Sequence, residues 1–454
     1  MNKRRNLDLT EGNIVKVLIL FAVPLFIGQF FQTLYHSVDS MVVGKLISSD
    51  ALAAVNASTS ISNTLVGFFT GLSAGVGVVF ARYFGAKNYK KLHEAIQTTV
   101  TFTLIAGIII VIIDIVFSRG FLVLLNTDAS IIDSAASYLR IYMFGVFFTA
   151  VYNVSSSVIR STGDSVSPFY HLVISSIMNI ILDLLFVGVF HIGVNGVGYA
   201  TVIAQGASVY LAFRRMRLMD PQYGLDIKDL HVDFEALKEV LSLGLPAAIQ
   251  SSITSIGNLF THRYINSFGK AATAGIPTAQ KIDQFAQLAA KGIGLGIPTF
   301  IGQNMGAKKY DRALQGTKIS FWLVTALTVI PGFVVLLFAK PLAHMFTDDP
   351  AVIEVILNML NVLMPLYFFM GLHQTFSGIN KGYSKATFDM ANNIFSMVIV
   401  SQAWLALSLT ANHVITNIYW CYPLTWASAG IIGAVYYILV VKKEVRKMIE
   451  EKES

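Results

Sequence analysis

Two acidic side chains inside long apolar segments are the strongest candidates for functional residues in this chain. Asp39 lies in FQTLYHSVDSMVVG and Asp183 in SIMNIILDLLFV. An acid in hydrocarbon is costly, and such residues usually face a cavity and mark an ion pathway. Because a low dielectric disfavours the charged form, a pair of such acids could load and release protons near ambient pH. We therefore expect Asp39 and Asp183 to couple transport to protons.

Polar neighbours support this expectation. Tyr35 precedes Asp39 by four residues and Asn179 precedes Asp183 by four, so each pair shares one helix face. Thr201, in GYATVIAQ, lies at a comparable depth if the turn at 190–195 is tight. These three side chains can hydrogen-bond an acid in either protonation state. The alternative is that each acid is a structural helix cap or part of a hydrogen-bonded pair.

For other polar residues and a proline inside apolar segments, the sequence allows more than one role. Gln32 and Asn153 either line a substrate cavity or join helices by hydrogen bonds. Pro24 lies fifteen residues before Asp39 in the same segment, so a kink there could let the segment bend when Asp39 changes charge. Asp283, with Lys281 and Lys291, favours a structural or gating ion pair over a transport site.

Several chemistries find no support in the sequence. It has no Walker-type nucleotide loop, no Cys/His metal spacing and no catalytic triad pattern, so we expect neither an enzyme nor a cofactor or metal site. Energy would come from an ion gradient. The net charge of +7 comes without interleaved aromatic and basic residues, which argues against a nucleic-acid partner.

The composition indicates which kind of structural element holds these residues in place. Charged residues make up 13% of the 454 residues, against about 25% in soluble domains. This predicts an all-α membrane protein with lipid as its surroundings. Segments of about 20 apolar residues can span a bilayer. Twelve are expected, at 14–38, 52–81, 95–117, 138–159, 165–190, 196–213, 240–264, 272–302, 316–339, 353–377, 386–408 and 420–441.

The basic residues predict an orientation. With the N-terminus inside, 25 Lys and Arg lie on the inner side and six on the outer side, while Lys281 and Lys291 lie within the eighth span. The positive-inside rule then places both termini in the cytoplasm of a plasma-membrane protein.

An internal repeat divides the chain into two halves. At an offset of 221, GLSAGVGVVFARYFGAKNYKKL (71–92) matches GIGLGIPTFIGQNMGAKKYDRA (292–313). A second echo pairs TGDSVSPF (162–169) with KGYSKATF (381–388), both before the fifth span of a half. Pro24 is matched by Pro246. Six spans per half make the repeats parallel. We expect an N-terminal six-helix lobe at 1–213, a cytoplasmic linker at 214–238 and a C-terminal lobe at 239–454.

The chain resembles the multidrug and toxic compound extrusion (MATE) family over nearly its full length. The resemblance rests on Pro24 with QTLYHSVDSMVVGKL and ALAAVNAS, on the GAKNYKK and GAKKYDR repeat, and on RSTGDSVSPF. It implies two parallel six-helix lobes in a V around a central cavity, and exchange of a drug against protons or sodium.

The resemblance is strongest to the DinF-like branch. There, Tyr35, Asp39, Asn179, Asp183 and Thr201 fall on the positions of the coupling cluster, and Gln32 and Asn153 on cavity positions. The similar sodium-coupled branch has acids in spans seven and ten. In these spans this chain has the uncharged or weakly basic residues Gln250, Asn258, His373 and Gln374 instead. This weakens the case for a sodium site in the second lobe but does not exclude sodium in the first lobe.

These observations together predict a monomeric exporter that exchanges organic cations or amphipathic drugs for protons by alternating access. Sodium coupling stays open, as does a flippase or exporter of a lipid or metabolite precursor. A channel or a receptor is a weaker alternative.

Overall fold

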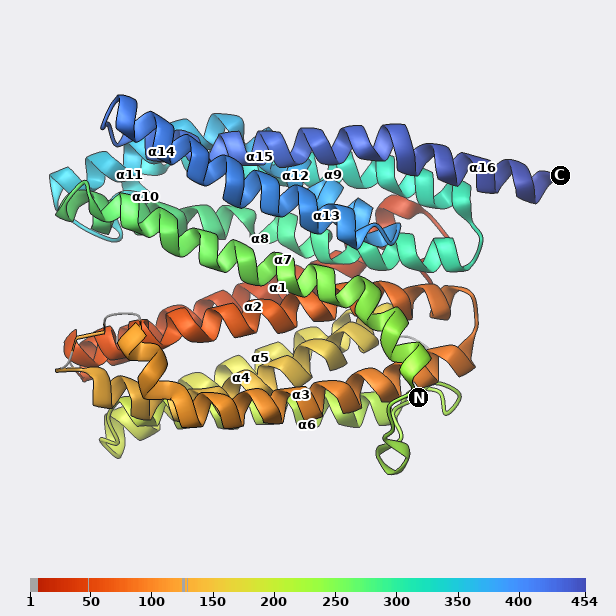
Figure 1. The fold of residues 1–454 in the computed structure, drawn as a ribbon, viewed down its shortest axis with the longest axis horizontal. Helices are drawn as coiled ribbons and strands as arrows, with labels where there is room; N and C mark the ends of the chain where they lie inside the picture. Colours follow the sequence, from red (N-terminus) through yellow and green to blue (C-terminus); the bar gives the residue numbers. More distant parts are fainter. Residues whose placement is uncertain (1–6, 48, 125–126, 129) are drawn as a thin grey trace. The chain divides into compact units, whose positions relative to one another are not determined.

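A computed structural model describes residues 7–47, 49–124, 127–128 and 130–454, most of which lie in long helices (Figure 1). The first half consists of α1 (Ile14–Leu46), α2 (Ser49–Gly85), α3 (Tyr89–Leu124), α4 (Ile132–Ser161), α5 (Val166–Asp183) with the π-helical segment η1 (Leu184–Val189), and α6 (Val194–Arg217). The short 3-10 helix η2 (Ile227–Asp229) follows.

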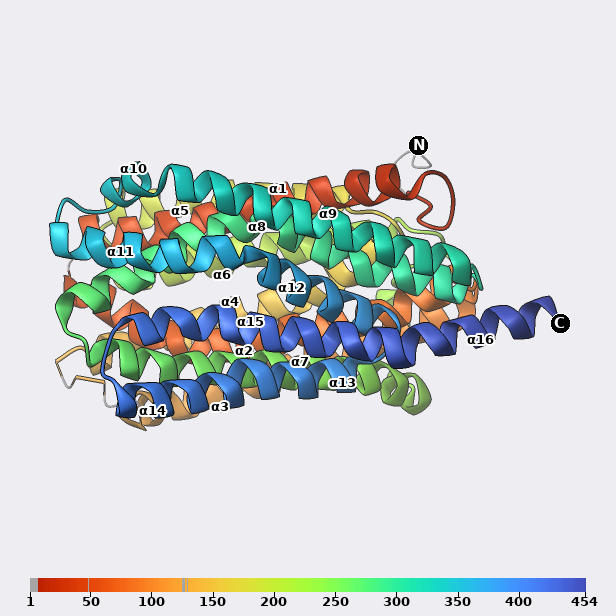
Figure 2. The same ribbon diagram turned by 90° about the horizontal axis from the view of Figure 1, so that it is seen from above.

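The second half repeats this order with more interruptions (Figure 2). It consists of α7 (Phe234–Asn266), α8 (Lys270–Gly306), α9 (Tyr310–Leu337), α10 (Ala339–His344), α11 (Pro350–Leu363), η3 (Met364–Leu366), α12 (Tyr367–Gly382), α13 (Ala386–Asn393), η4 (Ile394–Val400), α14 (Ser401–Ala411), α15 (Thr416–Tyr436), η5 (Tyr437–Val441) and α16 (Lys442–Glu453). The expected all-α membrane fold is confirmed.

Within the described residues, 11 helical segments are long and apolar enough to cross a membrane. The predicted span that is missing from these 11 is the eighth, at 272–302. It corresponds to α8, which has 37 residues and is therefore about 55 Å long at 1.5 Å per residue. This length exceeds the roughly 30 Å thickness of the hydrocarbon core of a bilayer. The helix is missing from the 11 segments because it is less apolar than they are. Lys281, Asp283 and Lys291 lie within it and explain the difference.

The internal repeat is visible in the backbone. Lys87 and Lys308, 221 residues apart, both adopt a left-handed conformation, with φ of 53° and 54°. The turns around them share one hydrogen-bond pattern: Lys87 N donates to Phe84 O, and Lys308 N donates to Met305 O. Each turn joins a long helix to the next, as the matched GAK motifs predict.

In the structure, the second repeated motif, TGDSVSPF and KGYSKATF, aligns with a shift of two residues from the pairing made in the sequence. Gly163 has φ of 88° and its N–H donates to Arg160 O, whereas Ser384 has φ of 62° and donates to Lys381 O. These turns are equivalent at the offset of 221, which pairs Gly163 with Ser384. The sequence comparison paired Gly163 with Gly382, because the shared glycine was a stronger signal than the turn that either residue makes.

The contacts divide the chain into two compact units. Unit 1 comprises Met1–Leu7 and Ile27–Ser251, and unit 2 comprises Asp8–Phe26 and Ser252–Ser454. Helices α1 and α7 are therefore each shared between the units, and the changes of unit come shortly after Pro24 and Pro246. The lobe boundaries at 213 and 239 describe chain order and stay a prediction.

Matched glycines explain how α1 and α7 come to be shared. In unit 1, a Cβ at Gly71 or Gly75 of α2 would collide with the backbone carbonyl of Ala247 or Leu243 in α7. In unit 2, the equivalent Gly292 and Gly296 of α8 meet α1: a Cβ there would lie 2.8 Å from Phe26 Cβ and 3.2 Å from Phe21 Cδ1. Small residues four apart allow such close helix packing in membranes. Each half thus packs its second helix on the first helix of the other half.

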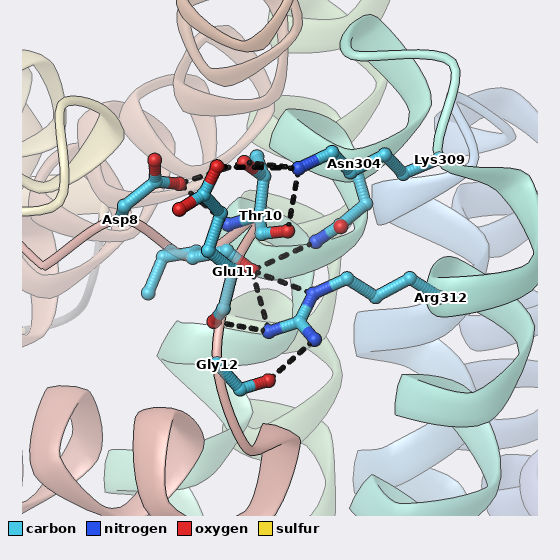
Figure 3. Close-up of polar contacts among 8 residues, drawn as sticks. Asp8, Thr10, Glu11, Gly12, Asn304, Lys309 and Arg312 are labelled. Atoms are coloured by element: carbon cyan, nitrogen blue, oxygen red, sulfur yellow. Dashed lines mark hydrogen bonds and ion pairs between the residues drawn. The ribbon is translucent and has the colours of Figure 1, made fainter.

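The segment that precedes α1 is held within unit 2 (Figure 3). Side chains of Asn304, Lys309 and Arg312, at the end of α8 and the start of α9, donate hydrogen bonds to the backbone carbonyls of residues 9–12. The distances are 3.1 Å for Asn304 Nδ2 to Leu9 O, 2.9 Å for Lys309 Nζ to Thr10 O, 2.6 Å for Arg312 Nη2 to Glu11 O and 2.7 Å for Arg312 Nη1 to Gly12 O. We call this contact the N-terminal clasp.

Candidate functional site

The two predicted acids come together inside unit 1. Asp39 lies on α1, and Asp183 is the last residue of α5, where the helix passes into the π-helical segment η1. The side chains of Asp39 and Asp183 are close enough to interact directly. Asp183 is fully buried. π-Helical turns are rare and are frequently found at functional sites.

The hydrogen bonding of this pair is incomplete in the described part of the chain. Neither carboxylate oxygen of Asp183 has a donor there, and Oδ1 of Asp39 also lacks one. Buried polar atoms in proteins are nearly always hydrogen-bonded. Two ionised carboxylates are acceptors only, so they cannot satisfy each other. One proton held between them would supply the missing donor, and this makes the pair a candidate proton site.

Asn179 adds an unfilled amide to the same site. It lies one helical turn before Asp183 on α5 and is buried, and neither its Oδ1 nor its Nδ2 has a partner among the described residues. An amide can donate to an ionised acid or accept from a protonated one. Asn179 thus lies on the same face of α5 as Asp183, and its part in coupling stays a prediction.

Three tyrosines border the acids. Tyr35 is within interaction range of Asp39 and Asp183 and is hydrogen-bonded to the Gln205 side chain of α6. Tyr138 and Tyr142 of α4 stack at 5.4 Å between ring centroids, and both are within range of Asp39. The sequence singled out Tyr35 alone. Two tyrosines four residues apart in the fourth span were the available signal for the others.

An apolar cluster that includes Tyr138 lies on the helices that form this site. It contains buried residues from four elements of unit 1, namely Val42, Val43, Tyr138, Val187 and Val197. The cluster keeps the acids in a low dielectric, where the balance between one and two negative charges responds strongly to nearby charge.

Thr201 is placed differently from the expectation for its hydroxyl group. It is buried on α6, but its Oγ1 donates to Val197 O of the same helix at 3.0 Å. Its Cγ2 would lie 3.3 Å from a Cβ at Gly145 of α4. The described contacts therefore join Thr201 to helix packing and do not join it to either acid.

The remaining predicted residues lie apart from the acid pair in the described contacts. Gln32 Oε1 accepts from Gln29 Nε2 at 3.3 Å, and Asn153 Nδ2 donates to Thr70 Oγ1 at 3.2 Å. Gln32 and Asn153 are both partly exposed. Pro24 lies inside α1, which continues as a helix on both sides of it.

No group of three or more metal-ligating side chains is found among residues 7–47, 49–124, 127–128 and 130–454. The oxygens of Asp39, Asp183 and Asn179 suit a hard cation, which includes a sodium ion as well as a proton. Such an arrangement could therefore bind a small cation.

Comparison with known proteins gives a consistent result. The family model MatE matches residues 24–185 and 246–403, so its two matches begin at Pro24 and Pro246. "Probable multidrug resistance protein YoeA" of Bacillus subtilis is 27% identical over 451 residues, which is 97% of each chain. "Probable multidrug resistance protein NorM" of Thermotoga maritima is 25% identical over 377 residues, 81% of this chain and 80% of that one.

A solved structure shares the fold. It is described as the outward-facing conformation of a multidrug resistance MATE family transporter of the MOP superfamily, and it has a TM-score of 0.90 at 20% identity, covering 99% of this chain and 100% of that one. The two matches to the family model correspond to the two repeats and together cover well over half of the sequence. The chain belongs to the MatE family of membrane transporters and is not an enzyme.

Proposed function

We propose that this protein is a secondary active multidrug exporter that exchanges cationic or amphipathic organic compounds for protons across the plasma membrane. The observation that carries the proposal is the pair of Asp39 and Asp183, in which Oδ1 of Asp39 and both carboxylate oxygens of Asp183 lack donors among the described residues. The names of relatives such as YoeA support the substrate class. The protein acts as a monomer in lipid, with both termini in the cytoplasm.

The proposed cycle starts with proton uptake by the acid pair from the outer side. Loss of negative charge removes the repulsion between Asp39 and Asp183 and allows α1 to bend at Pro24, where the proline interrupts the helical hydrogen bonds. The cavity of the N-terminal lobe then contracts and the drug leaves. Gln32 and Asn153 contribute polar contacts to the drug, and Thr201 supports α6 beside the acids. A membrane potential of 100 mV adds about 2.3 kcal/mol per charge moved.

The test is drug transport by purified protein in proteoliposomes with an imposed proton gradient. Ethidium flux is compared between the wild type, D39N and D183N. We expect each variant to lose at least nine-tenths of the proton-driven flux, because an amide keeps the shape of the acid but cannot exchange a proton.

The matched control is D114N. Asp114 is also buried in unit 1, on α3, but lies outside the acid pair. Its variant should keep most of the flux. Full proton-driven flux in both D39N and D183N would rule out the coupling role.

Sodium is the second candidate coupling ion, favoured by the oxygen ligands of Asp39, Asp183 and Asn179. The same proteoliposomes separate the two. A sodium gradient at equal pH on both sides should drive no ethidium flux if the proposal is right, and flux under that condition would assign sodium to the site.

A further inference from the structure

A second line of polar side chains runs along α8, within unit 2. Asp283, Gln287 and Lys291 follow one another at intervals of four residues and therefore share one face of the helix. They interrupt the apolar character of α8 near its middle. The proton-exchange cycle proposed above gives them no role.

Asp283 is fully engaged by its neighbours. It is 8% exposed; its Oδ1 accepts a short hydrogen bond from the hydroxyl of Tyr367 in α12, and its Oδ2 accepts from Gln287 Nε2 at 2.6 Å. Tyr367 is itself fully buried. Both carboxylate oxygens thus have donors, and the orientation of Asp283 is fixed.

Lys291 has no such partner. It lies two helical turns beyond Asp283, about 12 Å along the helix axis. Within the described part of the chain, no carboxylate oxygen is within 4.0 Å of its ammonium group and no hydrogen bond to it is found. Asp283 acts on it through space only. The described residues therefore leave the three donors of the ammonium unfilled.

The surroundings leave Lys291 within reach of a ligand. Its side chain is partly exposed. One turn further along α8, a Cβ at Gly294 would lie 3.4 Å from Gln374 Cγ, so this part of α8 faces α12. A positive charge in the middle of a membrane helix is costly unless an anion or a strong acceptor pairs with it.

We infer that Lys291 binds the carboxylate of a transported amphipath, so that the substrates of this protein include compounds that carry an acidic group. The inference rests on the proposed export function. A carboxylate offers two oxygens to the ammonium and neutralises its charge. The engaged Asp283 would hold Gln287 and Tyr367 in place while leaving the ammonium to the ligand.

The experiment uses two dyes that share one cationic xanthene ring system. Rhodamine 110 carries a free carboxyl group and rhodamine 123 carries its methyl ester. Binding of each dye to the purified full-length protein is measured by fluorescence polarisation, and the ratio of the two affinities is the readout. We expect K291Q to lower the preference for the acid over the ester at least fivefold relative to the wild type, and K291R to retain it.

The matched control is K281Q. Lys281 lies on the same helix but is exposed, so its variant loses the same charge and should keep the wild-type ratio. Ester binding by K291Q shows that the variant is folded. A ratio unchanged in K291Q, or lowered equally in K281Q, would overturn the inference.

The failure of this inference can be told apart from failure of the export function. If the protein exchanges ethidium for protons but K291Q leaves the dye ratio unchanged, only the carboxylate site is wrong. If the wild type binds neither dye and does not transport ethidium, both the export function and the carboxylate site are wrong.

Discussion

Asn179 and Asn392 are both buried asparagines in the fifth span of their half, and they differ in what they contact. Asn392 Nδ2 donates to Ala429 O of α15 at 2.9 Å, whereas neither amide atom of Asn179 has a partner among the described residues. A buried hydrogen bond inside a helix bundle contributes to folding. The amide of Asn179, one helical turn from Asp183, contributes nothing to folding by that route, and under the proposed function it would be available to the coupling ion.

We therefore predict opposite consequences of removing these two amides. Asn179→Ala should slow proton-driven ethidium flux at least tenfold while changing thermal unfolding little. Asn392→Ala should destabilise the protein by about 1 kcal/mol through loss of its hydrogen bond. Unfolding curves and flux assays on the same preparations check both. A flux in Asn179→Ala equal to that of the wild type would remove Asn179 from the site.

At the scale of residues, the sequence predicted the acids but only part of their surroundings. Asp39 and Asp183 are identifiable because an ionisable residue inside an apolar segment is rare. Tyr138, Tyr142 and Gln205 were missed, because tyrosine and glutamine inside spans are common and only the packing of α4 and α6 shows which of them face the acids.

At the scale of elements, the matched glycines of α2 and α8 allow a direct test. Gly75→Ala would place a methyl group against the carbonyl of Leu243 in α7, and the backbone there cannot move aside as a side chain would. We expect a loss of about 1–3 kcal/mol, as for other overpacked sites, seen as a lower melting temperature.

The control for this prediction is Gly120→Ala. Gly120 lies in α3, and a Cβ there would meet nothing within 4 Å. This variant should match or slightly exceed the wild type in stability, because alanine favours helix. Equal melting temperatures for Gly75→Ala and the wild type would show that α2 and α7 do not pack as closely as the structure shows.

Helix positions followed from apolar run lengths, and the exceptions have physical causes. Helix α8 is long enough to span a membrane, but its polar residues make it too polar to be recognised as a span by its hydropathy. The π-helical segments after Asp183 and Asn393 have no sequence signature, since one extra residue per turn leaves the apolar composition unchanged. The pairing of Gly163 with Gly382 failed because a left-handed turn can be made by Ser384 as well.

At the scale of the whole molecule, the orientation in the membrane is still a prediction, and the single cysteine makes it testable. Cys421 is buried, so the wild type should react little with a membrane-impermeant maleimide. In intact cells, D348C should be labelled from outside and S454C only after lysis. Labelling of S454C in intact cells would place the C-terminus outside. D348C serves as the matched exposed position, between α10 and α11.

Chain order alone does not reveal which helices form a compact unit. The repeat predicted two halves of six spans, and the family model matches the chain twice accordingly. The sharing of α1 and α7 between the units depends on which surfaces meet at Gly71, Gly75, Gly292 and Gly296, and a sequence repeat is silent on that point.

The N-terminal clasp and the sharing of α1 have a joint mechanical consequence. The segment before α1 is tied to unit 2 through residues 9–12, while the second half of α1 carries Asp39 and belongs to unit 1. Pro24, the proline inside α1, lies between residues 9–12 and Asp39 in the sequence. If Asp39 takes up the coupling proton as proposed, a bend of α1 at Pro24 would lie between the residues that are tied to unit 2 and the acid that belongs to unit 1.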